Sequence, residues 1–298
     1  MLILVTGASG QLGKSIKRLV DESKVGGYVF TSRDRLDLSY IDAIQGFFEA
    51  YKFDLIINCA AYTAVDKAET DKKNSNLINH LAVKKIAELA NKNNIKLIHI
   101  STDFVFDGLA NHALIESDIA KPVNVYGKSK LAGEQAILSI MKFNATIIRT
   151  SWLYSEFGNN FVSTMLSLMQ EKPNLSIVSD QVGTPTYASD LAKAILCIVE
   201  SDSLNLKKKK SQIYHYSNEG ECSWYEFASE IKSISDSRCI LNPISTDDYP
   251  TAAERPKKVL MNKQRISQDF DLKIQFWKDS LKVCLNNILT ESLPKKSS

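Results

Sequence analysis

The sequence predicts an α/β fold in which a doubly wound parallel sheet carries a small C-terminal lobe. Apolar runs alternate with helical patterns through the first half of the chain, which is the order of strand–helix–strand units. Several runs, such as DLIINCAA at 54–61, are apolar without a break, as in strands that a parallel sheet buries on both faces. A glycine-rich turn follows the first run directly. These observations predict parallel strands joined by helical crossovers.

The elements of the first half follow one another regularly. Strands are expected at 1–7, 27–32, 54–61, 95–102 and 145–152. The spacing of apolar residues predicts helices at 11–21, 39–51, 75–93 and 130–140. Each of these helices would connect two strands of one sheet.

The pattern loosens after Trp152. Helices are expected at 159–170, 189–201 and 224–231. Ser189 or Asp190 is expected to cap the second of them. Further strands are expected at 175–180 and 212–217, and an irregular, proline-punctuated loop at 242–258. We therefore predict a sheet domain made of 1–151 with 173–216, and a lobe made of 152–172 with 217–298.

The composition is that of an ordinary globular protein. The chain has 298 residues and a formal net charge of +3, too weak to suggest a nucleic-acid partner. Its five cysteines are scattered without a C-x-x-C pair, which fits a reducing cytoplasm. No signal peptide, metal-ligand spacing of histidines or membrane-spanning apolar run is visible. The basic run LKKKKS at 206–211 is expected to be a solvated loop.

The turn VTGASGQLG places Gly7, Gly10 and Gly13 between the first strand and the first helix. Glycine lets the backbone turn sharply and come close to a pyrophosphate, while the helix presents its N-terminal amides to the phosphates. In this context the turn predicts a Rossmann-type dinucleotide site. The sheet domain is therefore expected to bind NAD(P).

The end of the second strand distinguishes the two nicotinamide cofactors. An acidic residue there favours NAD, whereas a basic one accepts the 2′-phosphate of NADP. Ser32 and Arg33 stand at this point, so NADPH is expected; Asp34 follows and keeps NADH as an alternative. Asp37 and Leu38 are expected to flank the adenine.

A tyrosine and a lysine stand four residues apart in NVYGKSKLAGEQ at 124–135. Tyr126 and Lys130 would share one helix face, so the ammonium is expected to lower the pKa of the phenol from its usual ~10. Lys130 can also hold a nicotinamide ribose, while Tyr126 gives a proton to a carbonyl oxygen as hydride reaches its carbon. The pair is a weak motif alone, and the glycine turn gives it a catalytic context.

The segment HISTDFVFDG supplies polar groups at the end of the fourth strand, the ligand-binding edge of such sheets. Thr102 is expected to hydrogen-bond the same carbonyl oxygen as Tyr126, and Asp103 to bind substrate hydroxyls. Caps of the local backbone are the alternative for both. Small residues after the third strand, Ala60 and Ala61, would let the cofactor lie close to the backbone. The predicted cofactor site is Gly7, Ser9, Gly10, Gln11, Leu12, Gly13, Ser32, Arg33, Asp37, Leu38, Ala60, Ala61, Tyr62, Tyr126 and Lys130.

Eight segments give the chain a family resemblance. They are VTGASGQLG, NCAAYTAVDKAE, STDFVFDG, VYGKSKLAGE, RTSWLY, NNFVSTML, DQVGTPTYASDLA and a late Arg255–Pro256. Over most of its length the chain resembles the extended short-chain dehydrogenase/reductases and, more narrowly, the dTDP-4-dehydrorhamnose reductase family. The most specific pair is STDFVFDG followed by YGKSKLAGE.

The resemblance implies a reaction. NAD(P)H would deliver hydride to carbon 4 of dTDP-4-dehydro-6-deoxy-L-mannose, a nucleotide sugar. Tyr126 would be the proton donor, Lys130 its electrostatic partner and ribose anchor, and Thr102 the second contact of the carbonyl.

The resemblance also implies substrate contacts in the lobe. Asp103 and Trp152 would touch the sugar, although Trp152 at a strand end could equally belong to the core. Arg255 would meet the diphosphate, which suits a guanidinium fork; a solvated arginine is the alternative.

The sequence departs from the family pattern at two places. Lys257–Lys258 and Val259 follow Arg255–Pro256, where the family often has a small or polar pair before a leucine, and this puts the nucleotide contacts in question. Ser15 stands where some relatives carry an acid linked to a metal at a dimer interface. We therefore predict no metal site and no magnesium dependence. The oligomeric state stays open, with a homodimer as one candidate.

Three competing functions remain. A sugar-nucleotide dehydratase or epimerase has the same fold, but dehydratases place a glutamate where Phe104 stands. A regulatory NADP-binding subunit, such as the beta subunit of methionine adenosyltransferase, is similar in fold and has no turnover. A sister reductase would make a different 6-deoxy sugar, and the sequence does not distinguish these products.

Overall fold

The computed structural model describes residues 1–24, 26–201 and 210–291. Its centre is a parallel sheet with the strand order β10-β5-β4-β3-β1-β2. The strands are β1 (Ile3–Thr6), β2 (Tyr28–Thr31), β3 (Leu55–Asn58), β4 (Lys96–Thr102), β5 (Ala145–Thr150) and β10 (Gln212–His215). The chain adds β2 on one side of β1 and then returns to place β3 on the other side. This confirms the predicted doubly wound sheet and puts its switch point between β1 and β3.

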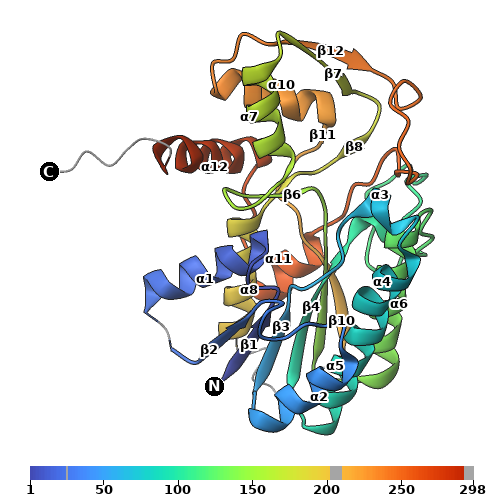
Figure 1. The fold of residues 1–298 in the computed structure, drawn as a ribbon, viewed down its shortest axis with the longest axis vertical. Helices are drawn as coiled ribbons and strands as arrows, with labels where there is room; N and C mark the ends of the chain where they lie inside the picture. The colour runs from blue at the N-terminus through green and yellow to red at the C-terminus, as the bar shows by residue number, and fades with distance from the viewer. Residues whose placement is uncertain (25, 202–209, 292–298) are drawn as a thin grey trace, which may run out of the picture.

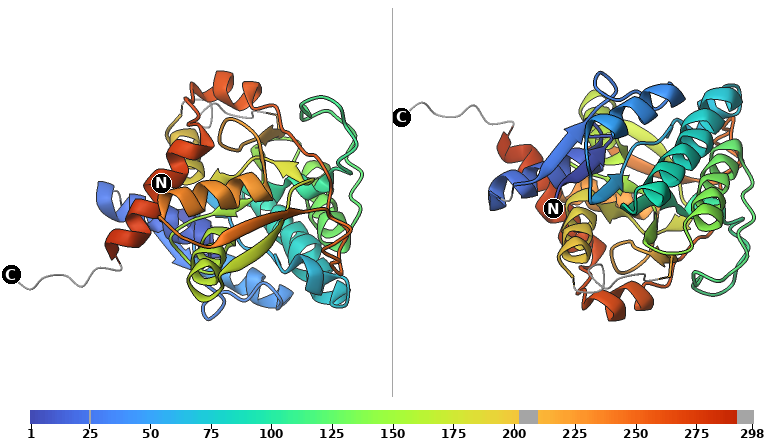
Figure 2. Two further views of the ribbon diagram at one scale, coloured as in Figure 1. Left: turned by 90° about the horizontal axis from the view of Figure 1, so that it is seen from above. Right: turned by 90° about the horizontal axis from the view of Figure 1, so that it is seen from below.

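Successive residues of each strand pack against opposite layers of helices. Ile3 and Val5 belong to the apolar cluster on one face, whereas Leu4 belongs to the cluster on the other. The first layer contains α1 (Gln11–Ser23), α8 (Ala188–Glu200) and α11 (Gln264–Phe270). The second contains α2 (Ile41–Ala50), α5 (Ala82–Lys92) and α6 (Val125–Ile140). Figure 2 shows the sheet between these layers.

A smaller lobe lies beyond the carboxyl ends of the strands, at the top of Figure 1. Its core joins three helices and a two-stranded parallel sheet around Phe227 and Trp277. These elements are α7 (Phe161–Glu171), α10 (Trp224–Ile234), α12 (Trp277–Glu291), β7 (Asn174–Val178) and β12 (Ile240–Ile244). Two short pairs also contribute residues to this core: β6 (Leu153–Tyr154) with β9 (Thr186–Tyr187), and β8 (Val182–Gly183) with β11 (Cys222–Ser223).

Two predicted segments lie elsewhere than expected. The strand predicted at 175–180 is present as β7, but it pairs with β12 in the lobe and not with the six-stranded sheet. Helix α11 comes from the part of the chain assigned to the lobe, yet Ile266 and Phe270 pack against the sheet. Both placements depend on long-range packing, which local patterns do not contain. The division into an NAD(P)-binding domain and a lobe stays a proposal.

Helix α8 begins one residue earlier than predicted, and its N-cap residue is Tyr187 rather than Ser189 or Asp190. Instead, Ser189 accepts a hydrogen bond from Arg18 and Asp190 accepts one from Asn218. These side chains therefore connect elements of the fold.

The chain between β3 and β4 is largely helical. It comprises α3 (Val65–Ala68), α4 (Lys72–Asn76), a π-helical turn at Leu77–Leu81 and α5. No helix among the described residues is both long and apolar enough to cross a membrane. Most of the basic run predicted as a solvated loop, residues 206–209, lies outside the described residues.

Candidate functional site

A cleft of about 710 Å³ lies at the carboxyl ends of the strands, where the winding of the sheet changes direction. Doubly wound sheets bind their ligands at this point. The sequence-predicted residues that line it are Gly7, Ser9, Gly10, Gln11, Leu12, Gly13, Ser32, Arg33, Asp37, Leu38, Ala60, Ala61, Thr102, Asp103, Tyr126, Lys130, Trp152 and Arg255. One cleft therefore brings together the glycine turn, the tyrosine–lysine pair and the late arginine.

Tyr62 is the predicted site residue that lies outside this lining. Its hydroxyl donates to Asp71 at 3.1 Å, and its backbone N–H donates to Asn79 Oδ1 at 2.8 Å. Asn79 is buried in the π-helical turn and also donates to the carbonyl oxygen of Tyr62 at 3.0 Å. The hydroxyl and the backbone N–H of Tyr62 are thus bonded to the helical segment after β3, and its role in binding the cofactor stays a prediction.

The glycine turn is shaped for close backbone approach. Gly7 has a φ of +68°, and a Cβ there would lie 2.7 Å from the backbone nitrogen of Ala60. A Cβ on Gly13 would lie 2.4 Å from the carbonyl oxygen of Gly7. Helix α1 starts behind the turn with Gly10 as its N-cap, and no side chain of the described residues caps it. Its first amides are therefore available to an anion.

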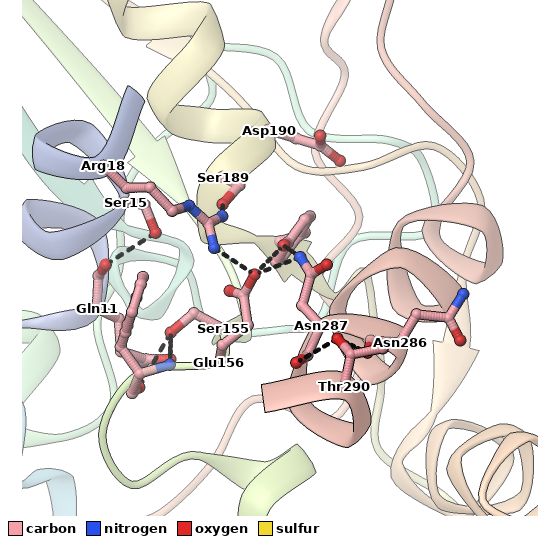
Figure 3. A network of polar contacts seen from close by, with 12 residues as sticks. Gln11, Ser15, Arg18, Ser155, Glu156, Ser189, Asp190, Asn286, Asn287 and Thr290 are labelled. Carbon is pink, nitrogen blue, oxygen red and sulfur yellow. Dashed lines mark hydrogen bonds and ion pairs between the residues drawn. The ribbon is translucent and has the colours of Figure 1, made fainter. Parts of the chain in front are cut away.

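The side chain of Gln11 is hydrogen-bonded to the segment after β5. Its Oε1 accepts a hydrogen bond from Ser155 at 3.0 Å, and its Nε2 donates to the carbonyl oxygen of Leu153 at 3.3 Å. Figure 3 shows this contact beside a second one, in which Glu156 lies between Arg18 of α1 and Asn287 of α12. Gln11 therefore ties α1 to the segment after β5, and its backbone amide is the part suited to a phosphate.

The end of β2 presents an exposed arginine to the cleft. Ser32 hydrogen-bonds Asp34, and this bond holds the pKa of the Asp34 carboxyl below its usual range. Asp37 accepts a hydrogen bond from the backbone of Ser39 at 2.8 Å. Arg33 lines the cleft next to these groups, in the position that suits a 2′-phosphate.

Helix α6 places Tyr126 and Lys130 side by side inside the cleft. Asn124 caps the helix by accepting from the backbone N–H of Gly127 at 2.8 Å. A Cβ on Gly127 would lie 2.1 Å from the carbonyl oxygen of Phe104, so glycine lets the helix start close to the loop after β4. Phe104 packs edge-on against the Tyr126 ring, with 5.6 Å between centroids.

A chain of buried polar groups holds Lys130. Its Nζ donates to the carbonyl oxygen of Ile100 at 2.6 Å and lies 3.4 Å from Nε2 of His99. The other ring nitrogen of His99 lies 3.0 Å from Asn58, whose Oδ1 accepts from Thr6 at 2.6 Å. Burial lowers the pKa of Lys130 to about 8 and keeps the pKa of His99 well below its usual value. His99 is therefore neutral, and Lys130 carries its charge at neutral pH.

The pKa of Tyr126 moves in the opposite direction from the one predicted. Burial raises it to about 12, because the charged phenolate is poorly solvated in the cleft; a hydrogen bond with Thr102 opposes the rise. The predicted lowering by Lys130 is not found: burial is the largest cause of the shift, and the charge of Asp103 raises the pKa of Tyr126 further. Burial also raises the pKa of Asp103 to about 7. The Tyr126 phenol is consequently protonated at neutral pH and can donate its proton.

Two tryptophans form one wall of the cleft. Trp152 stacks on Trp224 of α10, with 3.5 Å between ring centroids and 9° between the planes. The backbone of Trp152 has a φ of +44°, which is strained for a residue with a Cβ. Gly183 lies against the indole, where a Cβ would approach Cε2 to 2.7 Å. Trp152 therefore lines the cleft and also packs against the core of the lobe, and its contact with the sugar stays a prediction.

Arg255 reaches the cleft from the late loop and is held by an ion pair. Its two guanidinium nitrogens donate to the carboxylate of Asp66 in α3 at 3.0 and 2.6 Å. This contact lowers the pKa of Asp66. The fork geometry is the one by which arginine binds carboxylates and phosphates.

Sequence reasoning assigned no role to two residues of the cleft lining, Trp224 and Ser101. Trp224 forms half of the stacked wall, and its helix N-terminus carries a capping box of Ser223 and Glu226. Ser101 Oγ is buried in the cleft lining, with no hydrogen-bond partner in the described part of the chain. Ser101 could have been predicted from its place beside Thr102 at the end of β4, the ligand-binding edge of the sheet. No local sequence pattern indicates that Trp224 lines the cleft.

Comparisons with known proteins agree with this geometry. The family model of the RmlD substrate binding domain matches residues 1–290. A dTDP-4-dehydrorhamnose reductase of Aggregatibacter actinomycetemcomitans is 38% identical over 288 residues, covering 94% of this chain and 97% of the relative.

Solved structures give the same result. A dTDP-4-dehydrorhamnose reductase of Clostridium acetobutylicum has a TM-score of 0.90 at 36% identity, covering 97% of this chain and all of that one. The Bacillus anthracis enzyme in complex with NADP has a TM-score of 0.89 at 34% identity, with 96% and 100% covered. On sequence and structure together, the chain belongs to the dTDP-4-dehydrorhamnose reductase family.

Proposed function

We propose that this protein uses NADPH to reduce the 4-keto group of dTDP-4-dehydro-6-deoxy-L-mannose, giving dTDP-L-rhamnose. The observation that carries the proposal is a buried, protonated Tyr126 beside Thr102 and a charged Lys130, in the cleft that also holds the glycine turn. Relatives named for this reaction, and the NADP in one of their structures, support it.

The residues present fit a dinucleotide. The uncapped start of α1 and the side-chain-free surface of Gly7 would take the pyrophosphate, and Arg33 the 2′-phosphate. The ammonium of Lys130 would hold the ribose next to the nicotinamide. When bound, NADPH supplies a hydride for carbon 4 of the sugar.

The protein's own groups would supply the proton and orient the ketone. Tyr126 would give its proton to the carbonyl oxygen. The Thr102 hydroxyl, which donates to Asp103 at 3.1 Å, would turn to donate a hydrogen bond to the same atom. The charge of Lys130 stabilises the phenolate that is left. Phe104 lines the cleft beside Tyr126 with an apolar ring. A dehydratase has a glutamate at this position to move protons at carbons 5 and 6, so that acid–base group is missing here.

The lobe side of the cleft would bind the rest of the substrate. Trp152 offers an indole edge and Asp103 a buried carboxyl group to the sugar. Arg255 lines the same cleft and would bind the diphosphate with its fork by exchanging the carboxylate of Asp66 for a phosphate.

The test of the proposal is the oxidation of NADPH by the wild-type protein, followed by its absorbance. We expect steady consumption with dTDP-4-dehydro-6-deoxy-L-mannose made in situ, and slower consumption with NADH, because Arg33 favours the 2′-phosphate. NADPH binding without consumption would favour a regulatory subunit. Consumption only with another keto sugar would favour a sister reductase.

The pH dependence of kcat/KM for NADPH should report Lys130, since this parameter reflects the free enzyme. Its pKa of about 8 lies below that of a free lysine, so the cationic form is lost as the pH rises through 8. We expect kcat/KM to fall by about tenfold per pH unit above that value. Asp103→Asn is the control, because it removes the group near pH 7 and should leave this fall in place. A profile that stays flat to pH 9.5 or so would contradict the assignment.

The cytoplasm is the proposed compartment, since the five cysteines are free and suit reducing conditions. A homodimer is the candidate assembly, to be measured by sedimentation.

No cluster of three or more potential metal ligands occurs within 1–24, 26–201 and 210–291. Independence from magnesium stays a prediction.

A further inference from the structure

Asn124 connects the helix that carries Tyr126 with the loop that carries Arg255. Its side chain is buried, with 2% of the residue exposed. Oδ1 accepts from the backbone N–H of Gly127 at 2.8 Å and caps α6. Nδ2 donates to the carbonyl oxygen of Glu254, also at 2.8 Å. One amide is thus bonded both to the first turn of α6 and to the residue before Arg255.

The late loop, residues 253–258, is attached to other elements as well. The backbone N–H of Ala253 donates to Asp66 of α3 at 3.1 Å. The carbonyl oxygen of Lys257 accepts from Val182 of β8 at 2.8 Å. These contacts fix the loop to α3 and β8, whereas Asn124 fixes it to the helix of the proton donor. The position of Arg255 relative to Tyr126 therefore depends on the Asn124 amide.

We infer that Asn124 is a positioning residue that holds Arg255, and with it the diphosphate of the sugar nucleotide, in register with Tyr126. The inference rests on the proposed function. Asn124 precedes Tyr126 by two residues, and Glu254 precedes Arg255 by one. A displaced loop would move the diphosphate, and the tethered sugar with it, away from hydrogen-bond reach of the phenol.

The chemistry of the amide explains why asparagine stands at this position. An amide has an acceptor and a donor on one short side chain, and both are used here. Serine is nearly as good an N-cap but is too short to keep the bond to Glu254. Aspartate keeps the cap, but its second carboxylate oxygen has no proton to donate and repels the carbonyl oxygen of Glu254. Asn124→Ser and Asn124→Asp therefore break the second bond and preserve the first.

The test is calorimetric titration with dTDP, which needs no turnover. We expect Asn124→Ser to weaken dTDP binding by about tenfold, the scale of one lost hydrogen bond, and Asn124→Asp to weaken it more. NADPH affinity should stay near the wild-type value, because the cap is kept, and the melting temperature of Asn124→Ser should fall by only a few degrees, because one hydrogen bond is lost. In steady state, the KM for the sugar nucleotide should rise and the KM for NADPH should not.

A double-mutant cycle with Arg255→Ala separates positioning from a general structural role. If Asn124 acts through Arg255, the double variant Asn124→Ser/Arg255→Ala binds dTDP no more weakly than Arg255→Ala alone. Fully additive losses, or wild-type dTDP affinity in Asn124→Ser, would overturn the inference and leave the proposed function intact. A wild-type protein that binds no dTDP would overturn both.

Discussion

Replacing Tyr126 with phenylalanine should lower kcat by roughly 10²–10⁴-fold, the range that a positioned proton donor contributes. The substitution removes one oxygen and keeps the ring that packs against Phe104. The hydroxyl is the proton source of the cleft, since burial raises its pKa to about 12 and keeps it protonated. Thr102 would remain to hydrogen-bond the carbonyl oxygen, so some activity should survive.

Steady-state NADPH oxidation and equilibrium NADPH binding together check this expectation. The binding constant should change little, because the phenol oxygen is lost without disturbing the glycine turn. Tyr249→Phe is the matched control: this phenol is 57% exposed in the lobe, and its loss should leave kcat unchanged. A Tyr126→Phe variant with more than about a tenth of the wild-type kcat would exclude Tyr126 as the proton donor.

Replacing Glu134 with glutamine should lower the free energy of unfolding by about 3–5 kcal/mol. Glu134 lies four residues beyond Lys130 on α6 and binds Arg149 of β5 through Oε1 at 2.9 Å and Oε2 at 2.7 Å. Only 1% and 3% of the two side chains are exposed. The glutamine would leave the guanidinium buried without its counter-charge, next to a neutral His215 whose pKa burial lowers to about 3.

Chemical denaturation of three variants measures the effect of this pair. Asp21→Asn breaks an ion pair with Lys17 in which more than half of each side chain is exposed, and should cost about 0–1 kcal/mol. The double replacement of Glu134 and Arg149 by methionine should recover most of the stability lost in Glu134→Gln, because no charge is left buried. Equal losses in Glu134→Gln and Asp21→Asn would show that the buried pair does not anchor α6.

Features set by local sterics and spacing could be predicted from the sequence. A tight turn after a strand needs glycine where φ is positive, as at Gly7. The glycine spacing in this turn therefore indicates both the backbone turn and the dinucleotide that binds there. The four-residue interval of Tyr126 and Lys130 places both on one helix face whatever surrounds them.

Features set by long-range packing could not be predicted. The pKa of Tyr126 depends on how deeply the finished cleft buries it, and the ammonium of Lys130 is drawn to the carbonyl of Ile100. Trp224 becomes part of the cleft only by stacking on Trp152, which is distant in sequence. Strand β7 finds its partner β12 far along the chain, and nothing in its own pattern distinguishes a strand of the lobe from one of the main sheet.

The Trp152–Trp224 stack gives the protein a built-in optical reporter. Two indoles in nearly parallel contact couple their electronic transitions, so their near-ultraviolet circular dichroism depends on their mutual orientation. The third tryptophan of the chain, Trp277, is buried in the lobe core and should give a constant background. A ligand that separates or rotates the two rings therefore changes the spectrum as it enters. The binding of such a ligand can be followed without a label and without turnover.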